Sequence, residues 1–254
     1  MPMERPTMTH GRRFYGLGMM ALGLVCLAFG DFHPGQPVPK DFPHRMELAY
    51  AVATFMLVAG AAITWHRTAA RAAGAIAAYF GLVVVLLMNG RILVRHYAEF
   101  GPYESLAIQL AIAAGGLILF ATHANIEATF AERLVRAARW AFGLCALVFG
   151  VAHFEYMNLT APLVPRWLPP TQEFWAYATG VAHIAAGIAL LTGIQARLAA
   201  TLLTIMFASF TPLVHVPMLL ATPSNHWIWN ENAVNLALIG AAWVVAASLA
   251  KQMH

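Results

Sequence analysis

The chain has 254 residues, of which 60% are hydrophobic and only 10% are charged, with a mean hydropathy of +0.66 and a formal net charge of +4. Soluble globular domains carry about 25% charged residues, so this composition excludes a soluble protein with an ordinary charged surface. The basic residues form no stripe interleaved with aromatic residues, which argues against nucleic-acid binding. The composition predicts a helical membrane protein whose main partner is the lipid bilayer.

Eight apolar runs follow one another along the chain. Each is close to the roughly 20 residues that a helix needs to cross about 30 Å of hydrocarbon. The runs lack the strict alternation of barrel strands and are rich in Gly and Ala, as helix contacts in lipid tend to be. We therefore expect an all-α polytopic membrane protein with eight transmembrane helices, at residues 14–31, 46–65, 72–94, 104–122, 138–157, 173–192, 198–221 and 229–250.

Basic residues between the runs indicate the orientation. An even number of spans places both termini on one side, and ten of the fifteen Lys and Arg residues fall on that side. The positive-inside rule then places both termini in the cytoplasm. The ten residues are Arg5, Arg12, Arg13, Arg67, Arg71, Arg133, Arg136, Arg139, Arg197 and Lys251.

Two matching strings indicate an internal duplication. Val38–Pro43 (Val-Pro-Lys-Asp-Phe-Pro) and Val164–Pro169 (Val-Pro-Arg-Trp-Leu-Pro) each follow the first apolar run of one half of the chain. After one inserted residue, Gly60 aligns with Gly187, and Glu104 aligns with Glu231. Because each half has an even number of spans, the copies share one orientation. We expect two parallel-repeat four-helix bundles, at 1–122 and 138–254, joined by a cytoplasmic connector at 123–137.

The proline strings lie between the first and second spans of each half, on the outer side. Two prolines four positions apart exclude a helix interior, so each string is an extended or broken loop. Such a loop is either a stiff connector at the membrane interface or a lid over a binding site. His33 and His44 lie in the first of these loops, where we expect them to face water.

Polar residues inside the spans of the second half indicate a site. An ionisable group in a membrane span is costly, and each one here shares a helix face with small or polar residues, the face that packs against other helices. They could line a polar cup that opens outward. The first half does not reproduce it, because Met56 and Asn89 occupy the positions of two of the histidines. The candidate ligand-binding residues are His153, His183, Thr211, His215, Glu231 and Asn235.

Several functions remain open for this cup. It could bind a quinone or a similar lipid-soluble carrier, with histidine hydrogen-bonding a carbonyl. It could ligate haem, or a divalent metal through His153, His183, His215 and Glu231. A small-solute transporter and a purely structural assembly subunit are further alternatives. Since the sequence has no phosphate-binding loop, nucleophile elbow or His-Glu-x-x-His helix, a hydrolase or an ATP-driven pump is not indicated, and enzymatic activity is left open.

Several short motifs lie in the second half of the chain, namely Arg139-Trp140, Gly150-x-x-His153-Phe154, Val164-Pro165-x-Trp167-Leu168-Pro169, Tyr177-x-x-Gly180 and His215-x-Pro217, followed by Trp229 and Glu231. Together these motifs resemble the DoxX family of small bacterial membrane proteins. The resemblance implies a protein of the bacterial inner membrane with a four-helix unit, here doubled, that acts as the membrane subunit of a quinone-linked or redox-defence oxidoreductase, with other oxidoreductase subunits as partners.

Overall fold

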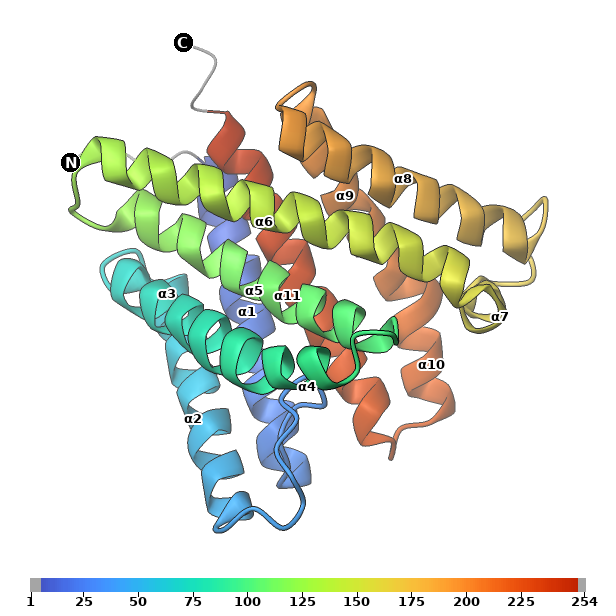
Figure 1. Cartoon of the computed structure of the whole chain (residues 1–254), viewed down its shortest axis with the longest axis horizontal. Helices are drawn as coiled ribbons and strands as arrows, with labels where there is room; N and C mark the ends of the chain where they lie inside the picture. Colours follow the sequence, from blue (N-terminus) through green and yellow to red (C-terminus); the bar gives the residue numbers. More distant parts are fainter. Residues whose placement is uncertain (1–5, 251–254) are drawn as a thin grey trace.

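The computed structural model describes residues 6–250 and is built from helices over that range (Figure 1). Arg5 and Lys251, which we used to predict the orientation, lie outside the described residues. Eight helical segments are long and apolar enough to cross a membrane, which confirms the predicted all-α polytopic class. The structure has α1 (Pro6–Phe29), α2 (Arg45–Thr64), α3 (Ala69–Ala78), η1 (Tyr79–Asn89), α4 (Gly90–Arg95), α5 (Gly101–His123), α6 (Ala128–Glu155), α7 (Met157–Thr160), η2 (Ala161–Leu163), α8 (Gln172–Thr192), α9 (Ala196–Phe210), η3 (Thr211–His215), α10 (Val216–Ala221) and α11 (His226–Leu249).

The third and seventh spans each contain a wider, π-helical segment. In the third span it is η1, followed by α4, and in the seventh it is η3, followed by α10. Pro212 at the start of η3 has no N–H and crowds the carbonyl four residues earlier, which favours such a segment. In η1 the Asn89 side chain donates to the Val84 carbonyl at 2.9 Å, and this satisfies an oxygen inside the segment.

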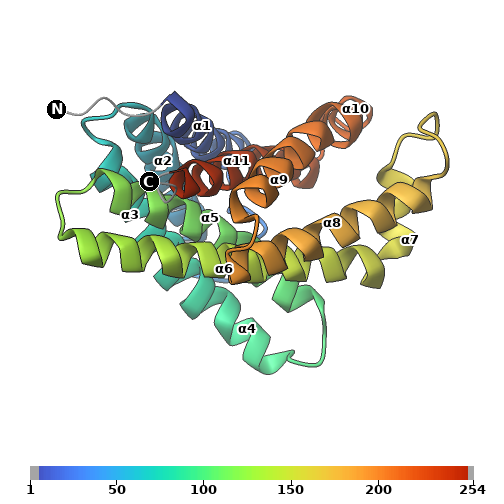
Figure 2. The same ribbon diagram turned by 90° about the horizontal axis from the view of Figure 1, so that it is seen from above.

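The two halves of the chain interlock, and α5 and α11 lie in the middle of the helix bundle (Figures 1 and 2). Within each half, consecutive spans pack against each other. The first span of each half also packs against the last span of the other half, since α1 contacts α11 and α6 contacts α5. The helices α5 and α11 contact each other, and most residues of α11 are buried. A site in the second half can therefore receive side chains from α5.

Close helix crossings recur at equivalent positions of the two halves. A Cβ added to Gly16 on α1 would lie 2.7 Å from the Gly60 carbonyl oxygen on α2. A Cβ on Gly143 of α6 would likewise lie 3.2 Å from the Gly187 oxygen on α8. Both pairs need glycine because the two backbones approach each other closely. These matched crossings support the proposal that the chain is a duplication.

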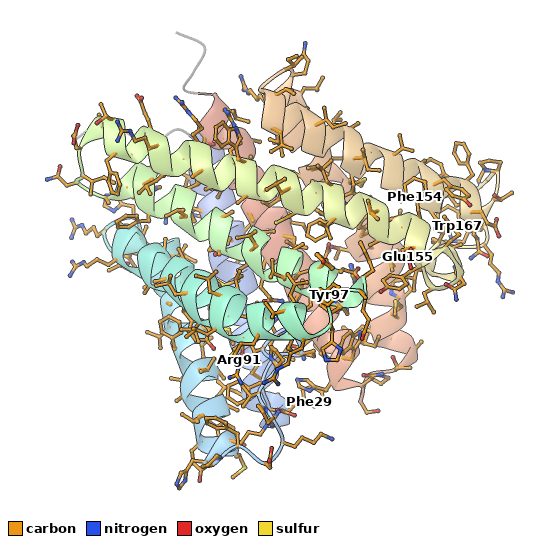
Figure 3. All side chains as sticks on the ribbon, viewed as in Figure 1. Phe29, Arg91, Tyr97, Phe154, Glu155 and Trp167 are labelled. Atoms are coloured by element: carbon orange, nitrogen blue, oxygen red, sulfur yellow. The ribbon has the colours of Figure 1, made fainter. Side chains whose placement is uncertain are left out.

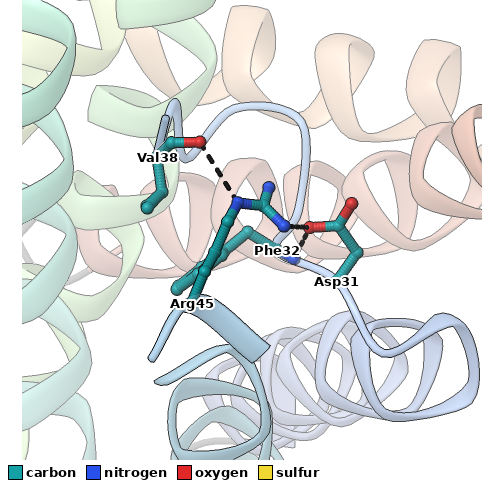
Figure 4. Close-up of polar contacts among 4 residues, drawn as sticks. All are labelled: Asp31, Phe32, Val38 and Arg45. Atoms are coloured by element: carbon teal, nitrogen blue, oxygen red, sulfur yellow. Dashed lines mark hydrogen bonds and ion pairs between the residues drawn. The ribbon is translucent and has the colours of Figure 1, made fainter. Parts of the chain in front are cut away.

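The loops after the first span also share a contact. In the first half, Arg45 Nε donates to the Val38 carbonyl at 3.4 Å, and the guanidinium pairs with Asp31 at 2.5 Å (Figure 4). In the second half, Gln172 stands at the equivalent position and its amide donates to the Val164 carbonyl. The first residue of the second span therefore fixes the proline string in both halves.

Candidate functional site

A cavity of about 610 Å³ lies in the second half of the chain. It is enclosed by α5, α6, α8, the α9–η3 span and α11, and by the loop that follows α6. Most of its wall is apolar, with Phe149, Met206, Phe207, Phe210 and Leu213 among the lining residues. The volume lies within the range of small-molecule sites, which is roughly 300–1,000 Å³.

Five of the six predicted site residues line this cavity, namely His153, His183, His215, Glu231 and Asn235. The sixth, Thr211, does not line it, but its hydroxyl accepts a 2.9 Å hydrogen bond from the Asn235 amide. The fold therefore brings the predicted residues from α6, α8, η3 and α11 to one place. Their role in binding stays a prediction.

His153 and His183 form a pair at one wall of the cavity. Their ring centroids are 5.0 Å apart and their planes are tilted by 40°. His153 Nδ1 lies 2.7 Å from the Phe149 carbonyl, and His183 Nδ1 lies 2.9 Å from the Thr179 carbonyl. Because a carbonyl oxygen only accepts, each Nδ1 carries the proton and donates. This fixes the orientation of both rings within their own helices.

Two asparagines hold the widened seventh span against α11. Asn235 donates to the Phe207 carbonyl at 3.1 Å as well as to Thr211, and Asn232 donates to the His215 carbonyl at 3.2 Å. The carbonyls near a π-helical segment need partners because the regular helical pattern is interrupted there. The amides thus keep η3, and with it His215, beside the cavity.

Glu104 lines the cavity as well, although it comes from α5 in the first half. It lies near enough to Glu231 for the two carboxylates to interact electrostatically. Among residues 6–250, Glu104 forms no ion pair with the nearby arginines Arg91 and Arg95 of α4. Its alignment with Glu231 was the one signal in the sequence that it shares this site.

The corresponding place in the first half is filled by the chain itself. The loop after α1 turns inward, so that His33 and Gln36 are buried. The Gln36 amide donates to Met56 Sδ at 3.8 Å, and the Asn89 amide donates to the Gly35 carbonyl at 3.0 Å. Met56 and Asn89 are the counterparts of His183 and His215. The first half is thus a plugged version of the cavity.

His33 corrects one expectation directly. We predicted that it faces water, yet only 4% of its surface is exposed, whereas His44 is exposed as predicted. The pKa of His33 is lowered to about 4, chiefly by burial and to a smaller extent by His226, while the Gln109 amide 3.3 Å from its Nε2 acts in the opposite direction. The prediction was wrong because loop position alone does not reveal that this loop folds into the bundle.

No group of three or more His, Cys, Asp or Glu side chains within residues 6–250 is arranged to hold a metal ion. The metal alternative, with His153, His183, His215 and Glu231 as ligands, therefore gains no support from the side-chain arrangement. Cys26 and Cys145 are free and buried, and neither lines the cavity.

A second cavity of about 410 Å³ adjoins the first. It lies between the proline-rich loop and the segment from Pro212 to Ala221, and both cavities share Leu163, Val164 and Leu213 in their walls. Trp167 in this loop and Phe154 at the end of α6 are exposed and lie at the same end of the molecule (Figure 3). The second cavity therefore lies beside the first, between the proline-rich loop and α10.

A family model described as a domain of unknown function (DUF8561) matches residues 142–247. The matched region contains all six predicted site residues. No curated protein and no solved structure matches the chain.

The resemblance to the DoxX family is wrong, because the family found is this domain of unknown function and no DoxX model matches. Some of the residues in its motifs have a general explanation in membrane helices. A Cβ on Gly150 would lie 2.8 Å from the Gly180 carbonyl, so these two glycines are explained by a close helix crossing. Prolines and a tryptophan in an interfacial loop are similarly common.

Proposed function

We propose that this protein binds a lipid-soluble, quinone-like molecule in the cavity of its second half and serves redox chemistry as an integral membrane subunit. One observation carries the proposal: an apolar cavity of about 610 Å³ whose wall includes three histidines and two carboxylates. Ionisable side chains at membrane depth mark functional sites by default. An aromatic head group with oxygen substituents matches phenylalanine walls combined with polar groups.

The position of the cavity supports a ligand that comes from the bilayer. The adjoining cavity beside α10 gives a lateral approach, and Leu220 on α10 is 77% exposed in the isolated chain. A molecule dissolved in the hydrocarbon would reach the site without crossing a layer of water. A hydrophilic solute would instead need a polar route, and the shared wall of the two cavities is formed by residues such as Leu163, Val164 and Leu213.

We assign the electron transfer to a partner oxidoreductase subunit. Both cysteines are buried away from the cavity, so neither thiol is placed to exchange electrons with a bound molecule. The contribution of this chain would be to hold the carrier and to accept or release protons through its histidines and carboxylates. We further propose that it resides in a bacterial inner membrane with both termini in the cytoplasm.

The proposal is tested by extracting the protein in mild detergent and identifying bound small molecules by mass spectrometry. Ala182→Trp would fill the cavity, because Ala182 lines it, whereas Ala185→Trp places the same ring on an exposed part of the same helix. We expect a quinone-class molecule with the wild type and with Ala185→Trp, but not with Ala182→Trp. The absence of any quinone from the wild type, or equal amounts in all three proteins, would overturn the proposal.

A further inference from the structure

The polar groups of the cavity consist mainly of hydrogen-bond acceptors. His153 and His183 each donate through Nδ1 to a carbonyl of their own helix. A neutral imidazole carries a single N–H, so Nε2 of each ring is left as an acceptor. Neither Nε2 has a hydrogen-bond partner among the described residues. Glu104 and Glu231 add carboxyl groups to the wall, which accept hydrogen bonds through both oxygens when they are ionised.

Most donors in the wall are already bonded to oxygens of the protein. The Trp175 indole donates to the Pro169 carbonyl at 2.8 Å, and the Thr179 hydroxyl donates to the Trp175 carbonyl at 2.8 Å. The Ser209 hydroxyl donates to the Met206 carbonyl at 2.7 Å. The Asn235 amide donates to both Phe207 and Thr211. The remaining donors are the His215 ring, the hydroxyls of Tyr156 and Thr160, and either carboxyl when it carries a proton.

In the first half, where the chain's own loop fills the equivalent position, the donors and acceptors are arranged in the same way. There the Gln36 amide donates a hydrogen bond to the sulfur of Met56, the counterpart of His183. The Gly35 carbonyl accepts from Asn89, the counterpart of His215. The group that fills the first half therefore presents a donor on the His183 side and an acceptor on the His215 side.

Resting on the proposed function, we propose that the cavity binds the reduced quinol form of the carrier in preference to the quinone. A quinol hydroxyl donates to the unpaired Nε2 acceptors of the His153–His183 pair, and a ring oxygen accepts from His215. A quinone has no O–H, so its oxygens would face those acceptors without a proton between them. A buried acceptor left without a donor is destabilising.

The test compares three probes in anaerobic binding titrations with purified protein in lipid nanodiscs: decylubiquinol, decylubiquinone, and the dimethyl ether of decylubiquinol. The ether keeps the ring and tail but has no O–H. We expect the wild type to bind the quinol about tenfold more tightly than either other probe, which corresponds to one hydrogen bond to a buried acceptor. The preference for the quinol should be smaller in His183→Met, which introduces the residue found at the equivalent first-half position, Met56.

The outcomes separate this inference from the proposed function. If the quinone or the ether binds as tightly as the quinol, the preference for a donor is wrong while quinone-class binding stands. If none of the three probes binds, the proposed function falls and this inference falls with it. Because the three-probe comparison uses the wild-type protein, the result does not depend on whether His183→Met folds.

Discussion

The His153 ring on α6 and the His183 ring on α8 lie 5.0 Å apart because Gly180 allows the two helices to approach each other. A Cβ on Gly180 would lie 2.9 Å from His153 Cβ and 3.0 Å from a ring carbon of Phe154. Real Cβ atoms essentially never show contacts below 3.0 Å, so any larger residue at this position must displace His153. The glycine thus positions a pair of residues that are distant in sequence.

Gly180→Ala should therefore weaken binding of the ligand. We expect a loss of about tenfold in affinity, because the displaced His153 ring no longer offers its acceptor at the same place. The measurement is the dissociation constant for decylubiquinol in nanodiscs. Gly81→Ala is the matched control, since the nearest atom to its added Cβ lies 4.0 Å away. Equal affinities in the two variants would show that the spacing of the pair is unimportant.

The contact between the halves gives a second prediction. A Cβ on Gly240 of α11 would lie 2.2 Å from the backbone nitrogen of Tyr15 on α1. Gly240→Ala should therefore separate α1 from α11 and destabilise the protein by about 1–3 kcal/mol, as overpacking does. The melting temperature in detergent should fall relative to Gly81→Ala. An unchanged melting temperature would mean that the α1–α11 packing contributes little to stability.

His33 gives a pH dependence. Its pKa is lowered from 6.5 to about 4 in the folded chain, chiefly by burial, whereas the unfolded chain takes up the proton near 6.5. Between these values the unfolded state binds more protons, so the free energy of unfolding falls as the pH drops from 6.5 to 4. The contribution of this one residue is about 3 kcal/mol.

His33→Asn should remove this contribution. The melting temperature of the wild type should fall more between pH 7 and pH 4 than that of His33→Asn, measured in the same detergent. His66→Asn changes an exposed histidine and should keep the wild-type pH dependence. If the curves of His33→Asn and wild type run parallel, His33 is not the buried neutral residue described above.

The orientation predicts which loops react with a membrane-impermeant maleimide. Ser224 lies in the turn between α10 and α11, on the predicted outer side, and Arg67 lies between α2 and α3, on the predicted cytoplasmic side; both are exposed. Ser224→Cys should react in cells whose outer membrane has been permeabilised and whose inner membrane is intact. Arg67→Cys should react only after the cells have been lysed. The native cysteines are buried and should give little background. The reverse labelling pattern would invert the assigned topology.

The spans and most of the site could be predicted because membrane burial imposes simple rules on sequence. Length and apolarity reveal the helices, and the shared face of small residues on α8 indicated that His183 points to neighbouring helices. The helix α6 begins at Ala128, so residues 128–137 of the predicted connector are helical. Three of these ten residues, Glu132, Arg133 and Arg136, are charged, and hydropathy alone does not distinguish a helix that extends from the membrane from a loop.

The rest of the site depends on contacts that no local pattern encodes. Glu104 reaches the cavity because the halves interlock and bring α5 beside α6. His33 and Gln36 fill the first-half counterpart because their loop folds inward, while the corresponding loop of the second half lines an open cavity. Two loops of similar sequence thus adopt different positions, because each packs against different side chains.

Photoaffinity labelling tests the central claim most directly. The wild-type protein in nanodiscs would be labelled with an azido-derivative of decylubiquinol, with and without excess unlabelled decylubiquinol, and the modified peptides mapped by mass spectrometry. The account predicts competed labelling on cavity-lining segments of α8, η3 and α11 and none at the first-half counterparts around Met56 and Asn89. Labelling that is spread over exposed helix faces, or that excess quinol does not reduce, would contradict it.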